Sequence, residues 1–524
     1  CLAPSLSPPR PPTSQLLALV CLAPSLSPSL RPAMHKALVV VDPISTGANL
    51  AQLLYDRGWP IVRVFSDGCP EKVKKHTPAG LTVEFVASIE HRGDVSATAA
   101  AVRAIGFDLH AIFVGCETGV LFTDLLADAL GLTGNLVAFS ELRRNKFLQT
   151  EAVRAAGLPA AHQALVSRAD QVEAFLAASA ATLSEGSAFK AVVKPVDGAG
   201  SDGVSICDSP DEVRRAFAAL SGSTNVLGLQ NDGVLLQEYL RGDEFVVDTV
   251  SRNGVHKCVA LWVYDKRWVS DDAPVVYYGM RCLQVEDDFA KYSGMIGYIF
   301  GVLNSIKLTH GAAHSEVKME PGSVRGPLLI EVNGRVHGGE GTWLPIPQEC
   351  AGYTQISALA DATLDPRAFD MIPAVPTGLR KRGAWVTVRS NVEGVISAID
   401  TLKMDQIRAL PSYHSEYLPP TLAPGHPIIR TTDACSVHGC FNLINADAAQ
   451  LERDYEVAQA VIDAGLFAVY PVHQSPSSPA RSVDSVDAED ERAVKRQATG
   501  APNVTDMRML LAEAPPRPES TETM

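Results

Sequence analysis

The feature that most constrains the fold is a regular alternation of short apolar runs and helical patterns between Lys36 and Gly134. Strands that alternate with helices of this length predict a parallel sheet whose faces are covered by helices, an α/β arrangement. The predicted strands are residues 37–41, 61–65, 83–86 and 111–114, and the predicted helices are residues 47–57, 95–105 and 118–130.

The length and composition of the chain indicate a globular protein with several domains. Its 524 residues exceed the size of a single hydrophobic core, so about two to four domains are expected. A formal net charge of −14 argues against nucleic acid as a partner, because nucleic-acid binding needs clustered Lys and Arg. No apolar run approaches the roughly 18 residues that span a bilayer, so no membrane partner is expected.

The two ends of the chain differ in composition from its middle. Residues 1–33 are rich in Ser, Pro and Leu, and Cys1–Pro8 recurs identically as Cys21–Pro28. Such an acid-poor leader suits an organellar transit peptide, but we prefer an artefactual or disordered leader before a natural start at Met34. Residues 473–524 are expected to form a disordered tail. The 10 cysteines occur singly, which is typical of a reduced, cytoplasmic protein.

The middle of the chain predicts two further units. Residues 136–349 contain many strands and few long helices, which is typical of an α+β domain, and residues 350–472 predict a C-terminal α+β lobe. The elements of the first unit are strands 191–195, 234–237, 245–250, 258–263, 275–281, 311–319 and 327–332, and helices 146–156, 172–176, 211–220 and 289–303. Those of the second are helices 357–364 and 448–464 and strands 384–388, 428–432 and 440–444.

One predicted strand carries an acid, an amide and a guanidinium at alternate positions. Because side chains alternate in a strand, Glu331, Asn333 and Arg335 lie on one face. Carboxylate and amide oxygens suit Mg²⁺, and an arginine one step further suits an anion beside the metal. Taken alone, the segment fits equally well a half-buried strand with a polar, solvent-facing side.

Three segments upstream of this strand carry further candidate residues. Lys146 opens an amphipathic helix, and Lys194 ends a short apolar strand. The glycine-rich loop 197–204 follows directly, and backbone N–H groups in such loops can approach phosphate oxygens. The segment Gln237–Phe245 then links two predicted strands.

In this order, the segments resemble the ATP-grasp superfamily, whose members use ATP to join a carboxylate to an amine or thiol. The resemblance covers roughly residues 36–364 and is strongest between Lys146 and Gly339. It implies an N-terminal parallel α/β (pre-ATP-grasp) domain at 34–135, an ATP-grasp domain at 136–349 and the C-terminal α+β lobe. Short strings around Asp42 and Arg335 resemble L-amino-acid ligases (dipeptide synthetases), and Glu-x-Asn-x-Arg also occurs in biotin carboxylase-like enzymes.

The resemblance also implies roles for individual residues in binding ATP. Lys146 and Lys194 are expected to neutralise the phosphates, and a glycine-rich lid with Gly198, Gly200, Ser201 and Gly203 is expected to cover them. The adenine is expected to bind the side chain of Gln237 and the backbone of Glu238 and Leu240. Glu244 is expected to accept hydrogen bonds from the ribose hydroxyls.

The metal-binding and catalytic residues follow from the same resemblance. Glu316, Glu331 and Asn333 are expected to bind Mg²⁺, with Mn²⁺ as the alternative metal. Arg335 is expected to hold the acyl phosphate or the substrate carboxylate. His314 is expected beside the transition state, and a plain strand histidine is the alternative interpretation.

The predicted function is ATP-dependent activation of a small-molecule carboxylate as an acyl phosphate, followed by amide formation with an amine. Amino acids or peptide-like molecules are the expected substrates, and a homodimer is the expected oligomer. Two alternatives stay open: a biotin carboxylase-like or purine-pathway enzyme, and an ATP-binding scaffold without turnover. Release of phosphate in the presence of bicarbonate would favour the carboxylase.

Overall fold

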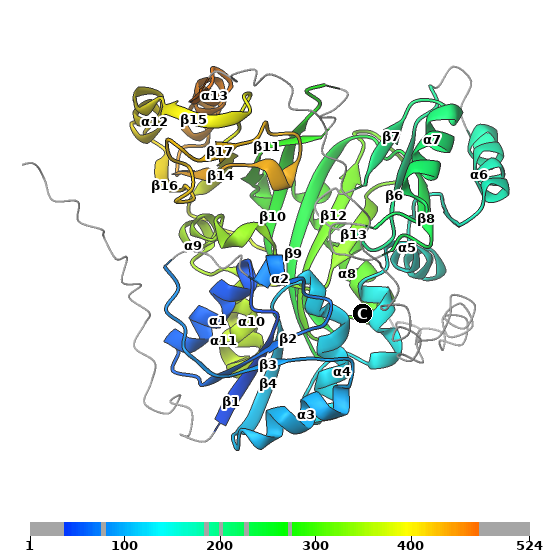
Figure 1. Cartoon of the computed structure of the whole chain (residues 1–524), viewed down its shortest axis with the longest axis vertical. Coiled ribbons are helices and arrows are strands. Elements are labelled where there is room, and N and C mark those ends of the chain that lie inside the picture. Colours follow the sequence, from blue (N-terminus) through cyan, green and yellow to red (C-terminus); the bar gives the residue numbers. More distant parts are fainter. Residues whose placement is uncertain are drawn as a thin grey trace, which may run out of the picture.

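The computed structural model of the protein describes residues 36–470, except for 75–79, 183–187, 199–202, 225–229 and 271–274. The leader predicted at 1–33 and the tail predicted at 473–524 lie outside these residues. Figure 1 shows the N-terminal sheet at the bottom, a lobe with α6 and α7 at the upper right, and a lobe with α12 and α13 at the upper left, with long strands between them.

The N-terminal sheet is parallel, with the strand order β3-β2-β1-β4, and this confirms the predicted fold of the region. Leu38 and Val40 pack towards α1 and α10, whereas Val39 and Val41 pack towards α3 and α4, so both faces of β1 are buried. The elements are β1 Lys36–Val41, α1 Thr46–Asp56, β2 Ile61–Phe65, α2 Glu71–Lys74, β3 Phe85–Glu90, α3 Val95–Ala104, β4 Asp108–Val114 and α4 Val120–Leu130.

A small antiparallel sheet with the order β5-β8-β6-β7 forms the second lobe, and α6 and α7 cover it. Val193 and Leu236 on the strands meet Phe175 of α6 and Val213 of α7 in its core. The elements are β5 Gln163–Val166, α6 Ala169–Thr182, β6 Ala191–Pro195, β7 Ser205–Cys207, α7 Pro210–Leu220 and β8 Val234–Glu238.

The longest sheet has eight antiparallel strands in the order β13-β12-β9-β10-β11-β14-β18-β16. Helices α5 and α8 pack on its first strands. In the β12–β13 pair Glu316 lies directly opposite Glu331, and His314 lies opposite Asn333. The elements are α5 Lys146–Ala155, β9 Asp243–Arg252, β10 Val255–Arg267, β11 Val276–Cys282, α8 Phe289–Ser305, β12 Gly311–Met319 and β13 Leu328–Asn333.

The C-terminal lobe continues this sheet, because β14 pairs with β11 across the predicted boundary at residue 350. A separate small sheet has the order β17-β15-β19. The predicted strand 428–432 is only the two-residue β17, and β15, β16 and α12 have no counterpart in the sequence prediction. The elements are α9 Pro345–Ala351, α10 Gln355–Leu364, α11 Pro366–Met371, β14 Arg382–Thr387, β15 Gly394–Ile399, α12 Thr401–Arg408, β16 Tyr413–Tyr417, β17 Pro427–Ile428, β18 Cys440–Asn445, α13 Ala448–Asp463 and β19 Phe467–Val469.

The fold class is thus parallel α/β at the N-terminus and antiparallel in the later lobes. The predicted domain boundaries stay predictions, and α10 shows why they are difficult to draw. It follows residue 350 in the chain, yet it packs in one core with α1 and β1 of the N-terminal domain. None of the helices in the described ranges is long and apolar enough to cross a membrane.

Candidate active site

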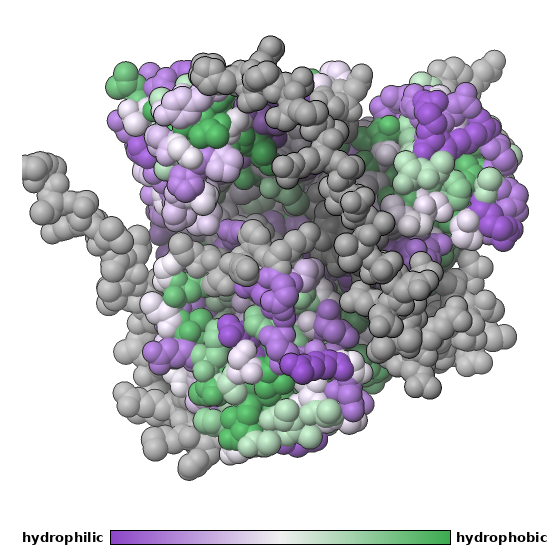
Figure 2. Space-filling view, in the orientation of Figure 1, coloured by the Kyte–Doolittle hydropathy of each residue, from purple (hydrophilic) through white to green (hydrophobic). Residues whose placement is uncertain are grey.

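A cavity of about 660 Å³ lies where the lobes meet, and Figure 2 shows the hollow between the lobe of α6 and α7 and the C-terminal lobe. Its walls come from β6, β8, β10, β11, β12 and β13, from the loop after β13, from β14 and from the turn Ala434–Ser436. All predicted site residues in the described part of the chain line it except Gly203. Residues spread over almost three hundred positions of sequence are therefore brought to one place.

The acid and amide side chains of β12 and β13 form one group on the cavity wall. Glu316 and Glu331 are neighbours across the strand pair, and Asn333 donates a hydrogen bond from Nδ2 to Oε1 of Glu331 at 3.3 Å. Burial alone would raise the pKa of Glu331, but the ammonium of Lys146 outweighs burial and lowers it. For Glu316, Lys266 and His314 outweigh burial in the same way, so both carboxylates are ionised.

This donor set fits Mg²⁺, because two ionised carboxylates and an amide provide the hard oxygen ligands that the metal prefers. Oε2 of Glu316 and Oδ1 of Asn333 have no hydrogen-bond partner among the described residues, although other atoms of both side chains do. Within the described part of the chain, two oxygens of the group are thus open to a ligand. The chemistry of the donor set agrees with the predicted metal ligands.

The two predicted phosphate-binding lysines reach the cavity from different elements. Nζ of Lys146 lies 2.7 Å from Oε2 of Glu331 and donates to the carbonyl of Gly198 at 2.8 Å. Lys194 is buried on β6 and donates to Oε1 of Gln237 at 3.0 Å. Burial, together with the nearby charge of Lys146, lowers the pKa of Lys194 to about 8. Two close ammonium groups are unfavourable without an anion, so the arrangement favours a phosphate ligand.

The predicted glycine lid is described only at its two ends. Gly198 lines the cavity and accepts the bond from Lys146. Gly203 has a φ of +66°, and a Cβ there would lie 3.0 Å from side-chain atoms of Pro195 and Leu220, so glycine is required. Gly200 and Ser201 lie outside the described residues.

The predicted adenine hinge follows β8. Gln237 and Leu240 are buried and line the cavity with Glu238. The Glu238 carboxylate points elsewhere, because it accepts two hydrogen bonds from Arg325 and one from the backbone N–H of His162. Its backbone N–H donates to the carbonyl of His162 at 2.9 Å, so the backbone carbonyl is the group of Glu238 that could meet a ligand.

Glu244, the predicted ribose ligand, forms a close ion pair with Lys266 of β10. Burial raises the pKa of Glu244, while the carboxylates of Glu244 and Glu316 together with Tyr277 outweigh burial and raise that of Lys266. Lys266 also lies over the rings of Tyr264 and Tyr277. A ribose hydroxyl would therefore have to share the Glu244 carboxylate with Lys266. The sequence alone did not predict that Lys266 pairs with Glu244.

Arg335 is held by an acid from the N-terminal domain. Its Nε donates to Oε2 of Glu117 at 2.9 Å, and its Nη1 donates to the carbonyl of Val336 at 3.0 Å. Glu117 follows β4 and begins the turn before α4. Burial alone would lower the pKa of Arg335, but Glu117, Glu331 and Glu316 together with Cys116 outweigh burial and raise it. The guanidinium is fixed and charged at the cavity wall, where an anion can bind it.

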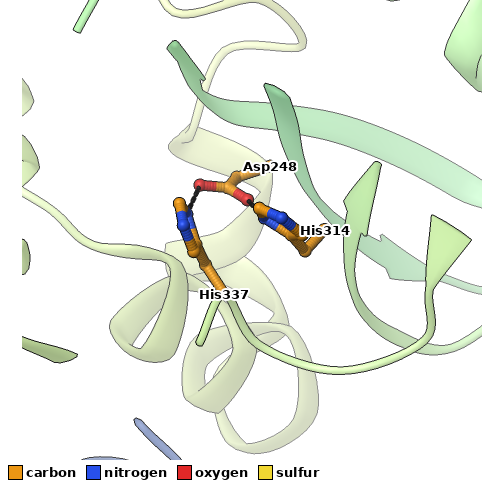
Figure 3. A group of neighbouring side chains, drawn as sticks. All are labelled: Asp248, His314 and His337. Carbon is orange, nitrogen blue, oxygen red and sulfur yellow. Dashed lines mark hydrogen bonds and ion pairs between the residues drawn. The ribbon is translucent and has the colours of Figure 1, made fainter. Parts of the chain in front are cut away.

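Figure 3 shows a group of two histidines and an aspartate, which lies next to the acids through His314. Nδ1 of His314 lies 3.1 Å from Oδ1 of Asp248, and Nδ1 of His337 lies 2.9 Å from Oδ2. Nε2 of His314 lies 3.1 Å from Oε1 of Glu316. Against the effect of burial, these carboxylates raise the pKa of His314 to about 9, so it is a cation. Sequence reasoning missed Asp248 and gave His337 no role of its own.

Sequence reasoning also missed the contribution of the C-terminal lobe. From that lobe Trp385, Ala434, Cys435 and Val437 line the cavity, and Trp343 lines it from the segment just before residue 350. Tyr264 and Lys266 line it as well. Arg281 does not: it pairs with Glu452 of α13 at 2.7 Å.

Fold and site together define an ATP-dependent ligase, and comparison with known proteins agrees. The model of the ATP-grasp domain family matches residues 187–343. Dapdiamide A synthase of Enterobacter agglomerans is 30% identical over 421 residues, which cover 80% of this chain and 94% of that protein. The chain therefore belongs to the ATP-grasp family of carboxylate–amine ligases, enzymes that form C–N bonds.

Solved structures show the same fold. An L-amino acid ligase from Bacillus licheniformis has a TM-score of 0.60 at 17% identity and covers 83% of this chain and 99% of its own. The biotin carboxylase domain dimer of Hydrogenobacter thermophilus 2-oxoglutarate carboxylase, in complex with MgADP, ADP and bicarbonate, has a TM-score of 0.51 at 12% identity. It covers 78% of this chain and 85% of its own. ATP and Mg²⁺ are the nucleotide and metal of the family, and the substrates are small molecules.

Proposed function

We propose that the enzyme activates the carboxylate of an amino acid or peptide-like substrate as an acyl phosphate and joins it to the amine of a second substrate. The observation that carries the proposal is the convergence of Lys146, Lys194, the acids of β12 and β13, and Arg335 on one cavity. Similarity to an L-amino acid ligase and to dapdiamide A synthase supports the amino-acid nature of the substrates.

In the first half-reaction, the substrate carboxylate attacks the γ-phosphoryl group of ATP. Arg335 holds the carboxylate, because its guanidinium is fixed by Glu117 and faces the cavity. Lys146 and Lys194 hold the phosphate oxygens and stabilise the charge that spreads over them in phosphoryl transfer. Mg²⁺, when bound by Glu316, Glu331 and Asn333, supplies further neutralisation of this charge.

In the second half-reaction, the amine attacks the acyl carbon and phosphate leaves. No side chain has to act as a covalent nucleophile. The reactive acyl phosphate needs protection from water. The depth of the cavity and its aromatic side chains, Trp343 and Trp385, support such protection.

The test is a phosphate-release screen over pairs of L-amino acids and small carboxylates with ATP and Mg²⁺. We expect release that depends on both a carboxylate and an amine, and its loss in Glu331→Ala. Exposed Glu84 provides the matched control, and Glu84→Ala should keep wild-type rates. Release that needs bicarbonate instead of an amine would favour the carboxylase, and ATP binding without release would favour the scaffold. Activity that persists in Glu331→Ala would refute the metal assignment.

Three finer predictions accompany this function. Mn²⁺ should replace Mg²⁺, because both accept oxygen ligands in similar geometry. A homodimer is the proposed oligomer, on the general frequency of twofold symmetry. The cytoplasm is the proposed location, because no disulfide joins cysteines within the described part of the chain.

A further inference from the structure

His337 lies in the loop that follows β13, two residues after Arg335, and its side chain lines the cavity. Its Nδ1 lies 2.9 Å from Oδ2 of Asp248, a residue of β9 that has no solvent exposure. Figure 3 shows the Asp248 carboxylate between the rings of His337 and His314. Asp248 therefore orients both histidines from behind the cavity wall.

The hydrogen bonds of Asp248 determine which nitrogen of His337 carries the proton. Asp248 accepts from Nε1 of Trp262 at 2.8 Å and from Nδ1 of His314 at 3.1 Å. Against the effect of burial, His337 and His314 lower the pKa of Asp248, so the carboxylate is ionised and can only accept. Nδ1 of His337 must then be the donor, and in the neutral ring the lone pair is left on Nε2.

His337 is neutral under physiological conditions. Burial lowers its pKa to about 4, and the cations of His314 and Arg335 add to the decrease, although Asp248 opposes it. These three are the charged groups that face the ring: Asp248 from β9, His314 from β12 and Arg335 from the same loop. An anionic acyl phosphate in the cavity would raise the pKa and make the ring a better base.

His337 lines the cavity, and its Nε2 is not among the buried polar atoms that lack a partner. Nε2 has no hydrogen-bond partner among the described residues, whereas Nδ1 and the backbone N–H are both engaged. The side chain keeps 8% of its surface exposed. Since Nε2 can only accept, its partner in the cavity has to be a donor such as an amine.

The ring is rigidly held. Trp343 stacks on it, with ring centroids 4.6 Å apart, and donates from its Nε1 to the carbonyl of Gly338 at 2.7 Å. The backbone N–H of His337 donates to Oε1 of Gln355 at 2.7 Å. Such fixation favours proton transfer, because the acceptor needs no reorganisation.

His314 cannot do the same. Both of its ring nitrogens are engaged with carboxylates, one of Asp248 and one of Glu316, so neither nitrogen is open to the cavity. Its predicted place beside the transition state stays a prediction. Of the two rings, His337 alone offers an acceptor to the cavity.

We propose that His337 is the general base of the second half-reaction, with Asp248 as its positioning residue. The proposal rests on the proposed function. The free amine gives its lone pair to the acyl carbon, and the C–N bond forms while the bond between the acyl carbon and the phosphate oxygen breaks. Phosphate leaves with that electron pair, and the proton lost by the nitrogen goes to Nε2 of His337.

The test compares two nucleophiles on one acyl phosphate. Wild type and His337→Asn are supplied with ATP, Mg²⁺ and the best carboxylate of the screen, and then with either its amine partner or hydroxylamine. Hydroxylamine is unprotonated at neutral pH and attacks with little help from a base. Asn keeps a donor for Asp248 but removes the nitrogen that faces the cavity. We expect the ratio of amide to hydroxamate rates to fall about 10²–10⁴-fold, and Asp248→Asn should lower it too.

Buried His256 of β10 provides the matched control, because it bonds Ser251 and Asn304 and does not line the cavity. His256→Asn should leave the ratio at the wild-type value, and His337→Gln should repeat the result of His337→Asn if the latter folds poorly. An unchanged ratio of amide to hydroxamate rates in folded His337 variants would overturn the proposed role of His337 and leave the proposed function standing. Wild type that forms neither product would contradict the proposed function, and the role of His337 with it.

Discussion

Two parts of the cavity wall differ in origin and in chemistry. The charged lining consists of Lys146, Lys194, Glu316, Glu331 and Asn333 from α5, β6, β12 and β13. The aromatic lining consists of Trp343 and Trp385, with Ala434, Cys435 and Val437, from the turn before α9, from β14 and from the turn before β18. The charged lining carries the kinds of side chain that bind phosphate and metal. The aromatic lining carries unreactive side chains that give the cavity its shape.

This difference suggests a division of labour. Charges that neutralise phosphate must be present whatever the substrate, since the phosphoryl transfer is the same. Aromatic walls contribute shape and apolar area, and these discriminate between side chains of substrates. We therefore expect substitutions in the charged lining to lower the turnover of all substrates equally. Substitutions in the aromatic lining should instead change which substrates have the highest kcat/KM.

The largest effect is expected for Glu316→Gln, which removes a charge from the β12–β13 pair. Turnover should fall about 10²–10³-fold, because one carboxylate ligand of Mg²⁺ is lost and with it part of the metal's neutralisation of the developing charge. The fall should be the same for every amino-acid pair in the phosphate-release screen. A loss of turnover confined to some amino-acid pairs would contradict the proposed division of labour, because the charged lining would then also select substrates.

An intermediate effect is expected for Trp385→Leu. The indole lines the cavity and donates from Nε1 to Oγ1 of Thr342 at 3.1 Å. The ratio of kcat/KM between two amino-acid substrates should change about 10–100-fold, as for other changes of pocket shape. The Kd for ATP, measured by calorimetry, should stay at the wild-type value. Trp385→Phe is the milder control, and an equal loss for all substrates would contradict the prediction.

The smallest effect is expected from pH on the charged lining. The pKa of Lys194 is lowered by burial to about 8, so above that pH the amine loses the charge that binds phosphate. The Kd for ATP should rise by at most about tenfold between pH 8 and pH 9. Lys194→Arg keeps its charge throughout this range and should remove the dependence. A wild-type Kd that is flat between pH 8 and 10 would show that Lys194 does not meet the phosphates.

The charged lining could be predicted from the sequence, and the aromatic lining could not. Glu331, Asn333 and Arg335 share a face because a strand has a period of two, so their grouping is local. The partner of His337, by contrast, is Asp248, 89 positions earlier in the chain, and no local pattern links them. Likewise, Glu117 reaches Arg335 across 218 positions, and only the docking of the N-terminal domain brings them together.

The fold shows the same contrast. The parallel N-terminal sheet could be predicted because its strands alternate regularly with helices, and most boundaries fall within a few residues of those observed. The C-terminal lobe was predicted poorly, because β15, β16 and β19 are short and only partly buried. Burial of such strands depends on neighbours that are distant in sequence, and their apolar patterns are weak.

The pairing of β11 with β14 makes the C-terminal lobe inseparable from the rest of the enzyme. Gly279 pairs with Val386 and Cys282 with Gly383, and the hydroxyl of Tyr455 donates to Asp265 of β10 at 2.8 Å. A chain shortened at residue 349 would leave β11 with a row of unpaired N–H and C=O groups, a template for aggregation. The lobe that contributes Trp385 to the cavity wall thus also covers the edge that β11 would otherwise expose, and exchanging this lobe between relatives would require the β11–β14 pair to be exchanged with it.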